Sequence, residues 1–240
     1  MYKQIVVAVV FVLFSASLLS AHEGWIENRD GELVFLYGHG QKLDPYKPEY
    51  IKEAKAIDAS GKAVAVEIVR GKNHASITPN GNPAIVTMLY DSGYWVKTTD
   101  GYKNIGKREA EKSKLTVVEA QKSRKDAKSI LTPCGKFSEP VGIFFEIIPG
   151  KDPFMAKIGD AFPIRVLIEG KPVEGLPISL GVTDHSQTKD LPKTDKDGWA
   201  NITISEPGLQ LITTKHTLPV SGDPDADILV ACTSLTFLVK

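Results

Sequence analysis

Histidine is the residue type in this sequence with the clearest potential for chemistry, and His22 stands out among the five histidines. It follows an apolar N-terminal segment that ends in the small residue Ala21, which is typical of a signal peptide cleaved at that point. A mature chain that begins at His22 presents two nitrogens of one residue, the α-amine and Nδ1 of the imidazole. Both atoms bind a metal ion readily once they are deprotonated. We therefore predict that His22 is the main ligand of a metal site.

Two further histidines are candidates for the same site. His39 lies between two glycines at the end of a predicted strand, so we expect its ring to be exposed at a sheet edge. The alternative for His39 is an ordinary turn histidine. His216 ends a predicted strand in the second half of the chain and is expected to approach from there. His74 and His185 lie in polar loops, where exposed histidines are common, and we expect both on the surface.

The expected ligands restrict the choice of metal. Imidazole nitrogens suit nickel, cobalt, copper and zinc. Square-planar nitrogen ligation favours Ni²⁺ or Cu²⁺, whereas added oxygen ligands suit Co²⁺ or Ni²⁺. With His22 and His39 in place, His216 or a carboxylate is needed to complete the site. The expected bound ion is Ni²⁺ or Co²⁺, with Cu²⁺ as an alternative.

Residues 1–21 have the pattern of a secretion signal. A short basic start precedes an apolar segment from Ile5 to Leu19, which is long enough for a signal peptide and short for a membrane span. Cleavage after Ala21 is the preferred interpretation, and cleavage at Ser17 or an uncleaved anchor are the alternatives. No later segment is apolar enough to cross a bilayer. We expect a periplasmic protein with no stable membrane insertion after signal cleavage.

Charge and cysteine content narrow the class of protein further. Lys plus Arg equals Asp plus Glu, 29 against 29, which gives no electrostatic reason to expect nucleic acid or an anionic membrane as a partner. The two cysteines are Cys134 and Cys232. In an oxidising compartment they are expected to form a disulfide, and the alternative is two separate buried thiols.

Short apolar runs separated by turn residues predict an all-β fold. In the second half the runs recur about every ten residues, which is typical of an immunoglobulin-like or transthyretin-like sandwich. We predict two β-sandwich units, residues 22–148 and 149–240. Residues 104–128 differ, because they are rich in Lys, Glu and Arg and have weak apolar spacing. We expect a partly helical excursion there, with a solvated charged face.

Signatures of catalysis are missing from the sequence. There is no Gly-x-Ser-x-Gly elbow, phosphate loop, His-Glu-x-x-His or dinucleotide fingerprint, so we do not expect an enzyme. Asp195-Lys196-Asp197-Gly198 lacks the further ligands of a calcium loop and predicts a turn. Asp223, Asp225 and Asp227 alternate in one loop, which we expect to be solvated and not a cation site.

One aromatic-rich stretch, Tyr90-Asp91-Ser92-Gly93-Tyr94-Trp95, has two interpretations. As a structural element it supplies core and hairpin packing, with a turn at Asp91-Ser92-Gly93. As part of a site it covers the metal and excludes water.

Several stretches, taken in order along most of the mature chain, are similar to one known family. They are Ala21-His22 with Trp25, Tyr37-Gly38-His39, Tyr90 to Trp95 with Asp100-Gly101-Tyr102, Val141 to Pro149, Asp152-Pro153, Gly159-Asp160, Val166 to Pro172 and Thr233 to Phe237. In these stretches the chain resembles the DUF4198 family, described as a periplasmic component associated with nickel and cobalt uptake transporters. The resemblance implies an exported, non-enzymatic protein that binds Ni²⁺ or Co²⁺ or delivers it to a membrane transporter. It carries over only His22 and His39 as ligands.

Three functions follow as hypotheses. The first is a periplasmic nickel- or cobalt-binding protein that serves metal uptake, with a membrane transporter as partner. The second is a carbohydrate-binding or structural module of the envelope without metal, for which Tyr94, Trp95 and Tyr102 are candidates for an exposed aromatic platform. The third is a copper oxidative enzyme that uses the same histidine, which requires an open coordination position and a substrate face.

Overall fold

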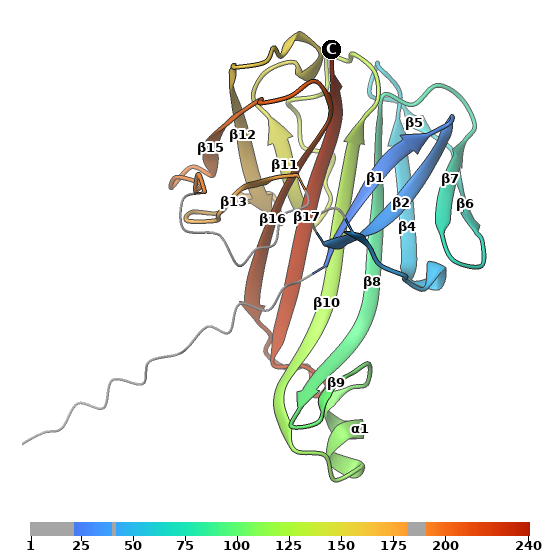
Figure 1. Ribbon diagram of the computed structural model, residues 1–240, viewed down its shortest axis with the longest axis vertical. Coiled ribbons are helices and arrows are strands. Elements are labelled where there is room, and N and C mark those ends of the chain that lie inside the picture. The colour runs from blue at the N-terminus through green and yellow to red at the C-terminus, as the bar shows by residue number, and fades with distance from the viewer. Residues whose placement is uncertain (1–21, 40–41, 182–190) are drawn as a thin grey trace, which may run out of the picture.

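The computed structural model describes residues 22–39, 42–181 and 191–240, without the side chain of His39 (Figure 1). Residues 1–21, where the signal peptide is predicted, lie outside this part. Within the described ranges α1 (Lys107–Lys112) is the single α-helix, and η1 (Pro48–Tyr50) and η2 (Pro153–Met155) are short 3-10 helices. No helix there combines the length and the apolar character that a membrane crossing demands. The predicted all-β fold class is confirmed.

A central sheet runs the length of the molecule (Figure 1). Its strand order is β14-β16-β17-β10-β8-β4-β5, and β9 pairs with β8. These strands are β4 (Ile51–Ile57), β5 (Ala63–Val64), β8 (Ile85–Thr98), β9 (Gly101–Lys103), β10 (Val117–Ile130), β14 (Ser179–Leu180), β16 (Gly208–Pro219) and β17 (Ile228–Val239). β10 pairs antiparallel with β8 and parallel with β17. Strands from before and after residue 149 are therefore joined in one sheet.

Two smaller sheets pack on the central sheet. The N-terminal sheet has the order β1-β2-β7-β6, with β3 on β2, and the C-terminal sheet consists of β11, β12, β13 and β15. The strands of the N-terminal sheet are β1 (Glu23–Arg29), β2 (Glu32–His39), β3 (Lys42–Leu43), β6 (Val66–Arg70) and β7 (Ala75–Pro79). Those of the C-terminal sheet are β11 (Phe145–Pro149), β12 (Ala161–Ile168), β13 (Lys171–Pro172) and β15 (Trp199–Thr203).

The two smaller sheets cover opposite faces of the central sheet. Successive side chains of a strand point to opposite faces, and β17 shows the consequence. The hydroxyls of Ser234 and Thr236 donate to carbonyls of β1, at 2.8 Å each. Phe237, on the other face, packs on Phe162 of β12 with ring centroids 5.1 Å apart. The fold is thus two β-sandwiches that share their middle layer.

Each sandwich has its own apolar core. One core lies between the central and C-terminal sheets and includes Phe145, Phe162 and Phe237. The other lies between the central and N-terminal sheets, where Phe35 stacks on Tyr90 at 5.4 Å. Branched and aromatic residues in strand positions supply both cores, as their preference for a pleated, half-buried surface predicts.

The prediction for residues 104–128 is right only in its first part. Helix α1 lies there, and the residues from Val117 onward belong to β10, which is an inner strand of the central sheet. The charged residues Arg108, Glu109 and Glu111 are exposed, whereas Lys125, Asp126 and Lys128 are almost fully buried. The prediction of a solvated face is therefore right around α1 and wrong for the inner part of β10, where Asp126 pairs with Arg124 and Lys128 pairs with the distant Glu146.

Lys128 forms the most deeply buried ion pair of the described residues. Its Nζ lies 2.7 Å from Oε1 of Glu146 on β11, and both side chains are almost completely excluded from solvent. Glu146 also accepts hydrogen bonds from the backbone N–H groups of Val141 and Gly142. The pair therefore ties the inner strand β10 to the first strand of the C-terminal sheet and to the loop before it.

Residues 91–93 do not form the predicted turn, because β8 continues through them. Ser123 of β10 pairs with Gly93 and Arg124 pairs with Asp91, so Ser92 is an extra residue in the ladder. Gly93 has φ +73°, a conformation that glycine adopts without strain. The turn-like composition here encodes a β-bulge within one long strand.

The expected disulfide is absent, since Cys134 and Cys232 are both free thiols. Cys232 is buried on the face of β17 that carries Ser234, toward the N-terminal sheet. Cys134 is partly buried and packs against the core on the C-terminal side. The two thiols thus lie on different sides of the central sheet and cannot be bridged.

Replacement of Lys128 by methionine tests the buried ion pair. We expect Lys128→Met to lower the free energy of unfolding by about 3–5 kcal/mol, because the carboxylate of Glu146 remains buried without its partner. Urea denaturation followed by circular dichroism measures the loss. Lys122→Met is the matched control on the same strand, since Lys122 is half-exposed and lies 3.9 Å from Asp91; it should change stability by less than about 1 kcal/mol. Equal effects of the two variants would contradict this account.

The thiols give a second prediction. In protein purified without reductant, Ellman's reagent should titrate both cysteines after unfolding. In the folded state it should modify Cys134 first, because burial raises the pKa of the Cys232 thiol and blocks access to it. Cys134→Ser identifies which thiol reacts. Detection of fewer than two thiols in the unfolded chain would show that a disulfide had formed.

Candidate functional site

His22 lies directly before β1, and its ring stacks on Tyr37 of β2 with a centroid distance of 4.7 Å and an interplanar angle of 8°. β1 pairs with β2 so that Glu23 is opposite Gly38. One further step along this register places the backbone of His39 opposite the backbone of His22. The hairpin therefore brings both predicted ligands to the same end of two paired strands, while the His39 side chain lies outside the described part.

A carboxylate reaches His22 from the segment that follows β3. Oδ2 of Asp44 lies 3.5 Å from Nε2 of His22, and its Oδ1 lies 3.7 Å from Nζ of Lys42. The backbone N–H of Asp44 donates to the carbonyl of Tyr37 at 2.8 Å, which fixes the loop against β2. Gly38 allows this close return, because a Cβ there would collide with the Lys42 carbonyl. The sequence predicted a carboxylate in general terms but did not identify Asp44.

His216 does not join His22. On β16 the side chain of Thr213 donates to Glu23 on the N-terminal side, whereas Thr214 donates to the Pro177 carbonyl on the other side. Because side chains alternate along a strand, His216 shares the face of Thr214 and points away from β1. Burial lowers the pKa of the His216 imidazole, which therefore stays neutral to lower pH than a free histidine.

The remaining histidines, His74 and His185, add no ligand to the site among the residues that the structure describes. His74 is exposed, as predicted, and His185 lies outside the described residues. Across the described ranges, which exclude the ring of His39, no group of three or more His, Cys, Asp or Glu side chains converges to hold a metal ion. The described part of the candidate centre is thus the pair of His22 and Asp44.

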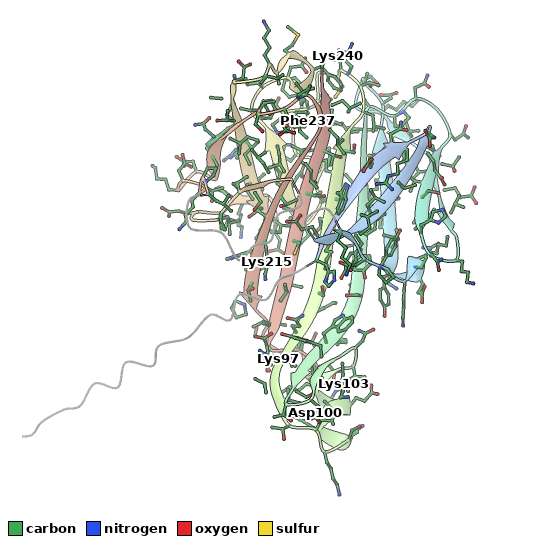
Figure 2. All side chains as sticks on the ribbon, in the orientation of Figure 1. Lys97, Asp100, Lys103, Lys215, Phe237 and Lys240 are labelled. Atoms are coloured by element: carbon green, nitrogen blue, oxygen red, sulfur yellow. The ribbon has the colours of Figure 1, made fainter. Side chains whose placement is uncertain are left out.

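A cavity of about 240 Å³ opens beside His22, between the end of the β1–β2 hairpin and the central sheet. Aromatic groups on its wall come from Tyr37, Trp95 and Tyr102. Ser92, Gln121 and Ser123 supply polar groups, and Lys125 and Lys215 supply ammonium groups. Lys215 lies midway along the molecule, above the narrow end marked by Lys97, Asp100 and Lys103 (Figure 2). None of the described residues that line the cavity is acidic.

Lys125 is the most unusual group in this wall. It is 3% exposed, and its Nζ lies 3.1 Å from the hydroxyl of Ser123. The same Nζ sits over the rings of Tyr37 and Tyr90, at 5.4 and 5.3 Å from their centroids. These contacts give cation–π stabilisation but no negative charge. Burial therefore lowers the pKa of the Lys125 ammonium.

The bulge in β8 decides which aromatic residues face the cavity. Tyr90 is opposite Lys125, and Trp95 is opposite Gln121, which is four residues earlier on β10. The extra residue changes the alternation, so Trp95 faces the same side of the sheet as Tyr90. Trp95 Nε1 donates to the hydroxyl of Ser92 at 3.0 Å, which fixes the indole in the wall. The structural interpretation of this stretch is confirmed for Tyr90, which packs in the core, while Trp95 lines the cavity.

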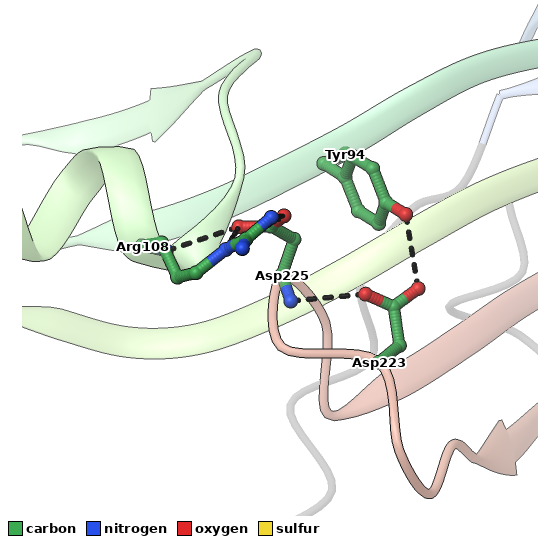
Figure 3. Close-up of polar contacts among 4 residues, drawn as sticks. All are labelled: Tyr94, Arg108, Asp223 and Asp225. Carbon is green, nitrogen blue, oxygen red and sulfur yellow. Dashed lines mark hydrogen bonds and ion pairs between the residues drawn. The ribbon is translucent and has the colours of Figure 1, made fainter.

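Tyr94 points to the other face and meets the acidic loop before β17 (Figure 3). Its hydroxyl donates to Oδ2 of Asp223 at 3.0 Å, so Tyr94, Trp95 and Tyr102 do not form one aromatic platform. Asp225 is paired with Arg108 of α1, and Asp227 lies 2.7 Å from Nζ of Lys107. The three aspartates anchor α1 and β8, and most residues of their loop are exposed, as expected.

Comparison with known proteins gives one match. A family model described as "Domain of unknown function (DUF4198)" matches residues 19–218, which is most of the chain. No curated protein matches the chain. No solved structure matches it either.

The pH dependence of the free energy of unfolding tests the environment of Lys125. We expect Lys125→Met to raise the free energy of unfolding at pH 7 by roughly 1–3 kcal/mol, because it removes a desolvated charge. The pKa of Lys125 is lower in the folded than in the unfolded chain, so the unfolded chain binds more protons between the two values. The stability of the wild type thus rises with pH in that range, and the advantage of the variant should shrink toward pH ~10.

Urea denaturation of both proteins at several pH values measures this difference. Burial raises the pKa values of Tyr37, Tyr90 and Cys232, so these groups also make stability depend on alkaline pH. They are present in both proteins, so the comparison is made on the difference in stability and not on either curve alone. A constant difference from neutral to alkaline pH would contradict the assignment to Lys125.

Proposed function

Because the chain belongs to the DUF4198 family and holds His22 beside a carboxylate, we propose that it is an exported metal-binding protein. In this proposal the leader is cleaved after Ala21, and the mature protein binds Ni²⁺ or Co²⁺ in the periplasm, with Cu²⁺ as a further candidate ion. It serves metal uptake by passing the ion to a membrane transporter. The main ligands are the α-amine and the imidazole of His22.

The contact between His22 Nε2 and Asp44 Oδ2, at 3.5 Å, is the observation that carries the proposal. A histidine that ligates a metal usually donates its other ring N–H to a carboxylate or carbonyl, which fixes the tautomer and makes the ligand more basic. With Nε2–H directed to Asp44, the lone pair of the neutral ring is on Nδ1. Nδ1 is the nitrogen that can bind the same ion as the α-amine of residue 22.

Stacking on Tyr37 supports the proposal because a chain terminus normally frays. The ring of His22 lies nearly parallel to that of Tyr37, and Tyr37 is itself largely buried beside Tyr90. Glu23, the next residue, is buried and accepts a hydrogen bond from Thr213 at 2.7 Å. The first two residues of the mature chain are therefore held from both sides of the strand, which reduces the entropy lost on binding an ion.

The backbone of His39, opposite that of His22, places a second imidazole-bearing residue at the same end of the hairpin. The His22 side chain is also 38% exposed. This exposure suits a protein that must release its ion to a partner, because remaining coordination positions stay accessible to ligands from outside.

Extension of the N-terminus tests the proposal. We expect mature protein that begins at His22 to bind Ni²⁺ at least about tenfold more tightly than protein with Gly-Ser-Gly-Ser added before His22. A four-residue extension is used because a shorter one leaves the α-amine within reach of the imidazole. Isothermal titration calorimetry with Ni²⁺, Co²⁺ and Cu²⁺ measures the affinities, and intact mass establishes the first residue.

Substitution of Asp44 tests the contribution of the imidazole to metal binding independently of that of the α-amine. Asp44→Asn should weaken Ni²⁺ binding about tenfold without unfolding the protein, because a neutral amide makes the imidazole less basic than a carboxylate does. Glu32→Gln, an exposed change at the far end of β2, is the control and should have no effect. The proposal fails if the extended protein binds Ni²⁺ as tightly as the native start.

A further inference from the structure

The cavity beside His22 contains a buried positive charge that the described protein does not neutralise. Lys125 and Lys128 lie on the same strand, and each is almost fully buried. Lys128 has Glu146 at 2.7 Å, whereas the hydrogen-bond partner of Lys125 is the neutral hydroxyl of Ser123. No carboxylate among the described residues forms an ion pair with Lys125. Leaving a buried ammonium without a counter-charge is costly, and proteins generally pair such groups.

The position of Lys125 suggests where the missing charge comes from. Its side chain lines the cavity of about 240 Å³, and the described wall around it has no acidic residue but a second ammonium, Lys215. An anion bound in this cavity would receive charge-assisted hydrogen bonds from Lys125, which is shielded from water, so that these bonds are strong. The lowered pKa of Lys125 agrees with a deficit of negative charge in the protein itself.

Gln121 requires the bound molecule to carry a hydrogen-bond donor in addition to its anionic group. Gln121 is one of the residues that line the cavity, and its Oε1 is buried and accepts no hydrogen bond from any described group. Gln121, Ser123 and Lys125 alternate along β10 and therefore share one face, with Gln121 and Lys125 at opposite ends of the polar row. An unsatisfied buried carbonyl oxygen needs a donor. The bound molecule must therefore present a hydroxyl or amino group as well as an anionic group.

We propose that this cavity binds a small carboxylic acid that also carries a hydroxyl or amino group. The carboxylate accepts hydrogen bonds from the ammonium of Lys125 and the hydroxyl of Ser123, and the donor group is bound by the carbonyl oxygen of Gln121. The rings of Tyr37 and Trp95 enclose the carbon skeleton. The volume of about 240 Å³ accommodates an amino acid or a hydroxy acid of the size of glutamate or citrate. This site goes beyond the metal proposal, because it does not need an ion at His22.

The test uses two pairs of acids that differ chiefly in the donor group, citrate with tricarballylate and glutamate with glutarate. Mature protein freed of metal with EDTA is titrated with each acid by calorimetry at pH 7. In at least one pair, we expect the acid that carries a hydroxyl or amino group to bind at least about tenfold more tightly than the acid without it. Inorganic phosphate is a further probe and should bind more weakly than this acid, because it cannot reach from Lys125 to Gln121.

Variants on one strand assign the contacts. Lys125→Met should reduce binding of the acid at least about thirtyfold, and Gln121→Leu should abolish the preference for the donor. Lys122→Met, on the opposite face of β10, is the matched control and should bind as the wild type does. Circular dichroism and urea denaturation establish that every variant is folded.

Three results would overturn the assignment. The first is that none of the four acids gives a heat of binding at millimolar concentration. The others are that folded Lys125→Met binds the acid as tightly as the wild type, or that phosphate and the acid bind with equal affinity. None of these results depends on Ni²⁺ affinity, which is measured separately on the same protein. Failure of the acid site and failure of the metal proposal are therefore distinguishable.

Discussion

The ion pair between Lys128 and Glu146 connects the central sheet to the C-terminal sheet. It is completely enclosed, with its two charged atoms 2.7 Å apart. Such a buried pair stabilises the folded protein little more than an apolar contact would, but removal of one partner lowers the stability strongly. β10 can therefore occupy the middle of the central sheet only if β11 is in place on the face that Lys128 points to. The same strand presents Lys125 to the opposite face, so the position of the cavity depends on this pairing.

The candidate site lies where regular strand pairing is interrupted. The β1–β2 hairpin ends at His22 above the central sheet, and the bulge at Ser92 turns Trp95 toward the same space. Without the extra residue, Tyr94 would face the cavity and Trp95 would face the acidic loop. One bulge thus determines both the aromatic wall of the cavity and the hydrogen bond between Tyr94 and Asp223.

Features encoded within a few neighbouring residues were predictable from the sequence. The turn at residues 195–198 formed as expected, because the side chain and carbonyl of Asp195 bind the backbone N–H groups that follow. The candidacy of His22 likewise rests on local sequence. Lys125 was missed because a lysine-rich run normally indicates a surface. Its burial depends on β8 and on the N-terminal sheet, whose Tyr37 lies over it, and no local pattern reveals that Lys128 pairs with a residue eighteen positions later.

The metal proposal and the acid proposal are linked by charge. His22 and Lys125 both contact Tyr37, with the ring centroids of His22 and Tyr37 4.7 Å apart and Lys125 Nζ 5.4 Å from the Tyr37 centroid. A divalent ion at His22 would be repelled by the ammonium groups of Lys125 and Lys215 in the same cavity. A carboxylate between them offsets this repulsion and can itself contribute an oxygen ligand. If both proposals hold, each occupant would stabilise the other, and thermodynamic linkage would require the two effects on affinity to be equal.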